Sequence, residues 1–289
     1  MKAIILLLTV ITANSTLAQG QKLNIIVIGA HPDDADWTTG GTAIKFARLG
    51  HRVLFVSLTN GDAGHFNKGG GALAKIRRAE AEEAGRRFGV TYKVLDNHDG
   101  ELMPDLFMRL QVIRLIREWN ADIVMGPRPN DYHPDHRNTA ILLQDAAYMV
   151  MVPNVASDTP PLKKNPVFLY VQDRFQKPYP FEPDIAVDIL DVYEQKIYGM
   201  AAHESQYFEW LPWVNGKLSE VPEGEKKRLE WLAPRRKKPV SPAVRSSLIK
   251  WYGPEKGNKV TDAEAFEICE YGRIPDDTEI KQLFPMLGN

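Results

Sequence analysis

Apolar segments of strand length alternate with amphipathic segments of helix length through the first half of the chain, and this alternation limits the accessible folds most strongly. The candidate strands are residues 23–29, 53–58, 91–96 and 122–126. The candidate helices are residues 38–49, 73–88, 105–119 and 137–150. Strands and helices that alternate in this order predict a mainly parallel sheet whose connections are right-handed crossovers.

The alternation continues as far as about residue 212. Two further strands are expected at 166–171 and 185–188, and a helix is expected at 191–203. We therefore interpret residues 19–212 as one α/β domain, a Rossmann-like open sheet that is mainly parallel and carries helices on both faces.

A C-terminal extension over residues 213–289 differs in composition from this domain. It is rich in Pro, Lys and Arg and then weakly helical, with helices expected at 262–271 and 276–284. Its basic run, EKKRLEWLAPRRKKP, is interpreted as a solvated helix face and linker because Glu residues interleave with it. Binding of an anionic polymer or lipid is the alternative. We expect the extension to pack on the main domain.

Charge and cysteine content limit the partners and the compartment. The 289 residues carry a formal net charge of −1, which gives no basic field for nucleic acid. Residues 1–18 combine a short positive start, an apolar run too short for a stable membrane span and a small-residue cleavage site, which predicts a signal peptide. An uncleaved anchor is the alternative. With Cys269 as the single cysteine, no intramolecular disulfide can form, which suits an exported protein of the periplasm or cell surface.

Two clusters of His and Asp follow two of the predicted strands. GAHPDDADWTTGG, at 29–41, follows the first strand, and PRPNDYHPDHRNT, at 127–139, follows the fourth. In an open sheet of order 3-2-1-4-5, strands one and four flank the point where the strand order reverses, and ligands bind beyond their carboxyl ends. We therefore expect the two clusters to face each other across one crevice.

Such a combination of side chains is typical of a metal site. Imidazole and carboxylate groups are ligands of Zn²⁺, and a site with three protein ligands leaves one position for water. Bound zinc lowers the pKa of that water toward neutrality, so that it becomes a nucleophile. Another divalent transition metal, such as iron, manganese or cobalt, fits the same ligand types.

The two clusters, AHPDDAD with WTTGGT and DYHPDH, resemble the PIG-L/LmbE-like family of zinc-dependent N-deacetylases. The resemblance covers roughly residues 23–210 and includes SLTNGDAG, IRRAEAEEAGRRFGV, DGEL and AAHESQ in the family's order. It implies removal of an acetyl group from N-acetylglucosamine units. Two departures are noted: Asp36 stands where the family often has Glu, and Asn60 stands where it often has Arg.

Carried over by position, the resemblance implies a role for each motif residue. His31, Asp34 and His136 would bind the zinc. Asp33 would be the general base, and His133 would stabilise the tetrahedral intermediate or protonate the leaving amine. Asp131 would orient His133 from behind. Arg77 and Asp99 would contact the sugar or its substituent.

Other interpretations of these residues remain open in the sequence. Asp33 could cap the following helix, and Arg77 could pair with Glu80 one turn along its own helix. Asp99 could be a turn residue, and His203 is interpreted as a partner for the end of a helix.

The aromatic residues near the end of the domain also have two interpretations. They are Tyr207, Phe208, Trp210 and Trp213. Aromatic faces can stack on sugar rings, whereas large aromatic side chains are equally suited to burial against the edge of the sheet.

Together these features predict an exported zinc hydrolase that deacetylates an N-acetylated amino sugar or glycoconjugate, with a small-molecule or glycan substrate. One alternative is an amide or ester hydrolase with a non-sugar substrate. Another is a non-catalytic protein that binds a metal or glycan. The sequence does not indicate the oligomeric state.

Overall fold

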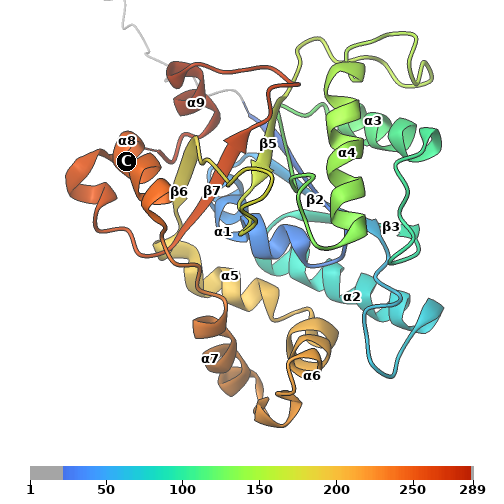
Figure 1. Ribbon diagram of the computed structural model, residues 1–289, viewed down its shortest axis with the longest axis vertical. Helices are drawn as coiled ribbons and strands as arrows, with labels where there is room; N and C mark the ends of the chain where they lie inside the picture. Colours follow the sequence, from blue (N-terminus) through green and yellow to red (C-terminus); the bar gives the residue numbers. More distant parts are fainter. Residues whose placement is uncertain (1–21, 288–289) are drawn as a thin grey trace, which may run out of the picture.

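A sheet of order β3-β2-β1-β4-β5-β7-β6 forms the centre of the computed structural model, which describes residues 22–287 (Figure 1). The strands are β1 Asn24–Gly29, β2 Arg52–Thr59, β3 Thr91–Asn97, β4 Ile123–Gly126, β5 Val167–Val171, β6 Ile185–Asp188 and β7 Ala263–Ile268. Neighbouring strands from β3 to β5 are parallel, and β7 is antiparallel to both β5 and β6. The predicted order 3-2-1-4-5 and the mainly parallel sheet are confirmed.

Helices cover both faces of this sheet, as predicted. The longer helices are α1 Asp34–Arg48, α2 Gly70–Phe88, α3 Leu106–Trp119, α4 Pro134–Met149 and α8 Pro242–Gly257. The shorter ones are α5 Tyr193–Met200, α6 Leu211–Val214, α7 Glu225–Arg235 and α9 Asp277–Leu283. Figure 1 shows α3 and α4 together on one side of the sheet, away from α5 and α7.

Side chains that alternate along β1 pack into two different clusters of the hydrophobic core. Ile25 and Val27 pack in the cluster that includes α1, α2 and α5, whereas Ile26 and Ile28 pack in the cluster with α3 and α4. Successive residues of a strand point to opposite faces, so a continuous apolar strand is buried on both sides. This is why LNIIVI could be identified as a central strand from its composition.

The segment 262–271 forms a strand, and the prediction of a helix there is wrong. Its residues Ala263–Ile268, AEAFEI, are mostly good helix formers, but they pair with β5 on one side and with β6 on the other. Strand pairing and burial outweigh local helix propensity here. The helix expected at 276–284 is present as α9. The C-terminal extension thus supplies a strand inside the sheet.

Glu264 of β7 makes a buried contact with the middle of α1. Its carboxylate accepts the backbone N–H groups of Gly41 and Thr42, at 2.9 and 2.7 Å, and the ammonium of Lys196 at 2.7 Å. Lys196 also donates to the Trp37 carbonyl of α1. Both charged side chains are almost fully buried, so each depends on the other.

Replacing Glu264 with glutamine is therefore expected to destabilise the protein strongly. The change leaves the Lys196 ammonium buried without a counter-ion and turns an NH₂ group toward a backbone N–H. We expect the free energy of unfolding to fall by about 3–5 kcal/mol in urea titration. The control is Glu270→Gln on the exposed turn after β7, which should change stability by less than about 0.5 kcal/mol. Equal stabilities of the two variants would contradict the importance of this ion pair.

Among residues 22–287, none of the helices is both long enough and apolar enough to cross a membrane. The predicted signal peptide, residues 1–18, lies outside the described residues and stays a prediction.

Candidate active site

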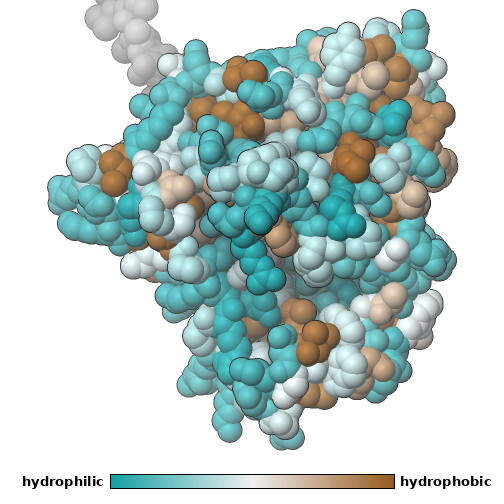
Figure 2. Space-filling model, in the orientation of Figure 1, coloured by the Kyte–Doolittle hydropathy of each residue, from teal (hydrophilic) through white to brown (hydrophobic). Residues whose placement is uncertain are grey.

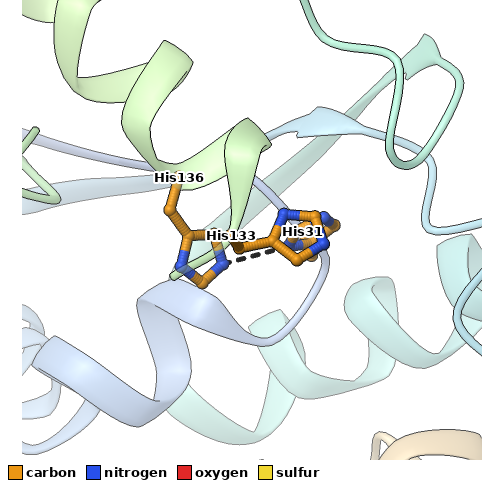
Figure 3. Close-up of side chains that lie close together, drawn as sticks. All are labelled: His31, His133 and His136. Atoms are coloured by element: carbon orange, nitrogen blue, oxygen red, sulfur yellow. Dashed lines mark hydrogen bonds between the residues drawn. The ribbon is translucent and has the colours of Figure 1, made fainter. Parts of the chain in front are cut away.

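The loops after β1 and β4 meet at the carboxyl edge of the sheet, as the strand order predicted. β1 pairs with β2 on one side and with β4 on the other, so the two loops are neighbours. The rings of His31 and His136 have centroids 5.1 Å apart, and His133 lies 4.6 Å from His31. Figure 3 shows His133 and His136 reaching from the start of α4 toward His31 in the loop after β1.

Three ligand-type atoms lie in a nearly equilateral triangle at this junction. His31 Nδ1 is 3.2 Å from His136 Nε2, and Asp34 Oδ2 is 3.6 Å from the first and 3.4 Å from the second. Tetrahedral ligands at 2.0–2.1 Å from one ion would be about 3.4 Å apart. The spacing of these three atoms therefore fits three corners of such a site.

The turn between β1 and α1 fixes Asp34 in this position. Its Oδ2 accepts the backbone N–H groups of Ala30 and His31, each at 2.8 Å. A Cβ atom at residue 29 would lie only 2.6 Å from the Cβ of Asp34, so the close approach requires Gly29. The sequence GAHPDD thus builds a turn that folds a carboxylate back beside the imidazole.

Carboxylates also stand behind the two histidine rings. His31 Nε2 lies 2.9 Å from Asp99 and 3.3 Å from Asp135, and His136 Nδ1 lies 3.1 Å from Asp131. A carboxylate on the outer nitrogen is the usual way to fix the orientation of a metal-binding histidine.

One of these contacts differs from the one that was predicted. Asp131 was expected to orient the His133 ring, but its carboxylate contacts the His136 ring and accepts only the backbone N–H of His133. Asp99 was expected to contact the sugar or its substituent; one of its oxygens contacts His31, and the substrate contact stays a prediction. Asp135 was given no role, although it is fully buried and accepts the N–H groups of Gly100 and Leu102. In the sequence, the only indication of a role for Asp135 was its position between the two histidines of HPDH.

Asp33 occupies a strained backbone position beside these ligand atoms. Its φ is 124°, which is unfavourable for a residue other than glycine. Its N–H donates to the Tyr92 hydroxyl, and its carboxylate accepts from Arg77 at 3.0 Å. The side chain makes no capping hydrogen bond to α1, so the alternative of a helix cap is wrong. Burial raises the pKa of Asp33 to about 6, although Arg77 opposes this shift.

Arg77 reaches across to this loop from α2. Its guanidinium donates to the Pro32 carbonyl as well as to Asp33, and its side chain is 1% exposed. The alternative pairing with Glu80 is wrong, because Glu80 accepts the backbone N–H and the hydroxyl of Ser205.

A buried hydrogen-bond network lies behind Asp33. Tyr92 donates its hydroxyl proton to Asp36 at 2.9 Å, and His203 Nε2 lies 2.9 Å from the other oxygen of Asp36. Burial alone would lower the pKa of His203. The charge of Asp36 has the opposite effect and holds the pKa above its usual value. His203 is therefore a partner of Asp36 and not of a helix end.

His133 is the N-cap residue of α4, and one of its ring nitrogens accepts a hydrogen bond. Its Nδ1 accepts the backbone N–H of Asp135 at 3.2 Å, which is the N-cap contact of the helix. Burial, followed by the charges of His31 and His136, lowers the pKa of His133. A neutral ring with Nδ1 as acceptor carries its proton on Nε2, so Nε2 is a hydrogen-bond donor.

The electrostatic field of the cluster favours a cation. Four carboxylates contact His31 or His136 directly, those of Asp34, Asp99, Asp131 and Asp135. The carboxylate of the neighbouring Asp33 pairs with the Arg77 guanidinium. Burial lowers the pKa of His31, yet hydrogen bonds with Asp135, Asp34 and Asp99 raise it well above its usual value. Burial also opposes protonation of His136, but Asp34 and Asp131 raise its pKa to about 10. Protons and metal ions compete for the same nitrogen atoms.

The aromatic residues after α5 are mostly structural. Tyr207 and Phe208 are buried. Trp213 is half exposed, but its two stacking neighbours are Phe66 at 5.3 Å and Trp210 at 5.4 Å, each nearly parallel to it. Stacked aromatic rings therefore join the loop after β2 to α6, and core packing accounts for Phe208 and for the ring of Tyr207.

Comparison with known proteins identifies the family. The family model described as GlcNAc-PI de-N-acetylase, PIG-L, matches residues 26–147. The chain is 30% identical over 212 residues to the diacetylchitobiose deacetylase of Thermococcus kodakarensis, covering 68% of this chain and 78% of the relative. It is 25% identical over 219 residues to a probable N-acetyl-alpha-D-glucosaminyl L-malate deacetylase 2 of Bacillus cereus, covering 72% and 94%.

A solved structure agrees with this assignment over most of the chain. The N,N'-diacetylchitobiose deacetylase of Pyrococcus horikoshii superposes with a TM-score of 0.64 at 26% identity, covering 89% of this chain and 88% of that one. The resemblance inferred from AHPDD and HPDH is confirmed, and the chain belongs to the PIG-L family.

Proposed function

We propose that this protein is a metal-dependent N-deacetylase that removes the acetyl group of an N-acetylated amino sugar or glycoconjugate. The observation that carries the proposal is the triangle formed by His31 Nδ1, Asp34 Oδ2 and His136 Nε2, with edges of 3.2–3.6 Å, next to Asp33, whose backbone has an unfavourable φ of 124°. The names of the two relatives, both deacetylases of N-acetylated sugars, support the reaction and the substrate class.

His31, Asp34 and His136 would hold the metal ion, and Zn²⁺ is the ion that we propose. Two imidazoles and one carboxylate are a common zinc set, and with three protein ligands one corner remains for water. A bound ion would supply a water of lowered pKa and would polarise the acetamide carbonyl. Asp135 and Asp99 behind His31, and Asp131 behind His136, support the same ligand set because they orient the rings.

The remaining residues would move protons during the reaction. Asp33 would accept a proton from the attacking water, and its raised pKa of about 6 suits a base that later passes this proton on. Arg77 would orient the Asp33 carboxylate through its contact at 3.0 Å. His133, whose neutral ring carries its proton on Nε2, would donate a hydrogen bond to the developing oxyanion, and the leaving nitrogen would receive the proton that Asp33 took from the water.

Metal analysis of the purified protein, paired with acetate release from a panel of substrates, tests this proposal. The panel contains N-acetylglucosamine, diacetylchitobiose, larger N-acetylated glycans and simple acyl amides and esters. We expect about one equivalent of zinc and acetate release from the sugars only. Bound metal without release of acetate from any compound would contradict the proposal, and release only from non-sugar amides would overturn the substrate class.

Removal of the Tyr92 hydroxyl is expected to impair the reaction through the position of Asp33. Tyr92→Phe keeps the ring but leaves the Asp33 N–H and one Asp36 oxygen without that partner. We expect the free energy of unfolding to fall by about 1–3 kcal/mol, and we expect kcat to fall more than KM changes. Tyr170→Phe, whose hydroxyl contacts Gln144, is the control and should keep kcat. An unchanged kcat in Tyr92→Phe would show that this hydroxyl does not position Asp33.

We also propose that the protein is exported, on the basis of the signal-peptide pattern in residues 1–18. Mass spectrometry of the mature N-terminus tests this proposal, and a chain that still begins at Met1 would contradict cleavage.

A further inference from the structure

Two basic side chains of the C-terminal extension lie over Trp37, and each has a buried nitrogen atom with no hydrogen-bond partner among residues 22–287. Lys238 Nζ is buried without a partner, 4.5 Å from the centre of the Trp37 ring. Arg236 has its guanidinium 5.5 Å from the same ring and 4.7 Å from the ring of Tyr207, and its buried Nε is also unpartnered. Aromatic faces stabilise cations but offer no acceptor in the ordinary hydrogen-bond geometry.

The carboxylates nearest to Lys238 are already engaged. Glu264 accepts Lys196 and two backbone N–H groups of α1, and Asp173 accepts Arg128 at 2.7 and 2.6 Å. Burial, and then the charge of Lys196, lower the pKa of Lys238 to about 7. A buried amine in this state gains from any anion that reaches it.

Lys237, which lies between Arg236 and Lys238 in the sequence, points in a different direction from both. Lys237 extends away from Trp37, toward Asp262 at 3.4 Å and the ring of Tyr193. Arg236 and Lys238 therefore share one side of the segment, and Lys237 lies on the other. The basic run that the sequence indicated as a solvated linker thus has two members packed on α1.

This cationic cluster lies next to the proposed reaction centre. Trp37 follows Asp33 by one helical turn, and its N–H donates to the Asp33 carbonyl at 3.0 Å. Tyr207 is 1% exposed, and its buried hydroxyl has no partner in the part of the chain that the structure describes. Its pKa is raised by burial and then by the charge of Asp33. In Figure 2, hydrophilic side chains gather over α5 and α7 and border a hollow near the middle of this face.

We infer that Arg236 and Lys238, with the Tyr207 hydroxyl, form a subsite for an anionic substituent of the acetylated substrate. The substituent is a carboxylate or a phosphate, since both present the oxygen acceptors that a guanidinium and an ammonium lack here. The inference rests on the proposed function, which it extends to a negatively charged amino sugar.

Sugar binding by a variant that cannot catalyse the reaction tests this inference independently of the proposed activity. In metal-loaded Asp33→Asn protein, calorimetry compares N-acetylglucosamine, N-acetylglucosamine 6-phosphate and N-acetylmuramic acid. We expect at least one charged sugar to bind about tenfold or more tightly than the neutral one. Which of the two is preferred distinguishes phosphate from carboxylate.

Three variants of the Asp33→Asn protein test which residues cause the preference for a charged sugar. Lys238→Met and Arg236→Met should each reduce the preference for the charged sugar to about twofold or less and leave binding of the neutral sugar unchanged. Lys237→Met removes the same charge from the neighbouring position and should keep the preference. Lys238→Met should also raise the melting temperature, because it removes a buried amine that has no partner.

Two results would overturn the inference. One is equal binding of neutral and charged sugars by the Asp33→Asn protein, and the other is a preference that survives in both Lys238→Met and Arg236→Met. A Lys238→Met protein with a lowered melting temperature and uniformly weaker binding would assign Lys238 a structural role. Failure of the proposed function is distinct, since the wild-type protein would release no acetate although the preference for charged sugars persisted.

Discussion

Asp33→Asn is expected to lower kcat by about 10²- to 10⁴-fold while the protein keeps its metal. The amide has the shape of the carboxylate but cannot accept a proton from water. Its oxygen can still accept the Arg77 N–H, and asparagine tolerates positive φ better than most residues. The fold and the ligand triangle should therefore survive, so that the loss appears in the chemical step.

The measurement combines initial rates of acetate release with metal content and thermal unfolding. KM should change by less than about threefold, because the side chain acts on the reaction and not mainly on ground-state binding. Near-wild-type turnover in Asp33→Asn would reject Asp33 as the base, and loss of the metal would make it a ligand instead.

His136→Ala is expected to lower the affinity for the metal by more than about 100-fold and to remove the activity with it. The change leaves Asp34 and His31 as two corners of the triangle, and it takes away the ring that Asp131 holds. The control is His51→Gln, which alters a histidine whose Nδ1 accepts the N–H of Leu23, just before β1. This control should keep full metal content after dialysis.

Lowering the pH should weaken metal binding by the wild-type protein, as the substitution His136→Ala is expected to do. The carboxylates around His31 and His136 raise the pKa of both rings, so protons compete effectively with the ion as the pH falls. Metal binding should therefore release protons and weaken toward low pH, which calorimetry in buffers of different ionisation enthalpy can measure. An affinity that does not change between pH 5 and 8 would contradict these two rings as ligands.

The part of the fold that carries the candidate site could be predicted because its signals are local. LNIIVI and DIVMG are apolar runs of strand length, and each is followed at once by the His and Asp motifs. The rule that ligands bind where strand order reverses then predicts that the motifs meet, and the observed pairing of β1 with β4 agrees.

The contacts that the sequence did not indicate depend on residues far apart in the chain. Asp36 and His203 are 167 positions apart, and their partnership follows from the packing of α5 on α1. The ring that Asp131 orients depends on the side-chain rotamers at the start of α4, which spacing alone does not fix. AEAFEI becomes a strand because two neighbouring strands present free backbone groups to it, and local propensity contains no information about them.

The position of β7 has a consequence for how the chain matures. During synthesis β6 is made long before β7, and without β7 it has no strand neighbour in the observed order. Its backbone edge and that of β5 stay open to other chains during this interval, which is a known route to aggregation. A chain cut short before residue 263 would also lack Glu264, and with it the clamp on the helix that carries Asp34. An incomplete polypeptide would therefore lack both the strand that joins β5 to β6 and the carboxylate that holds α1.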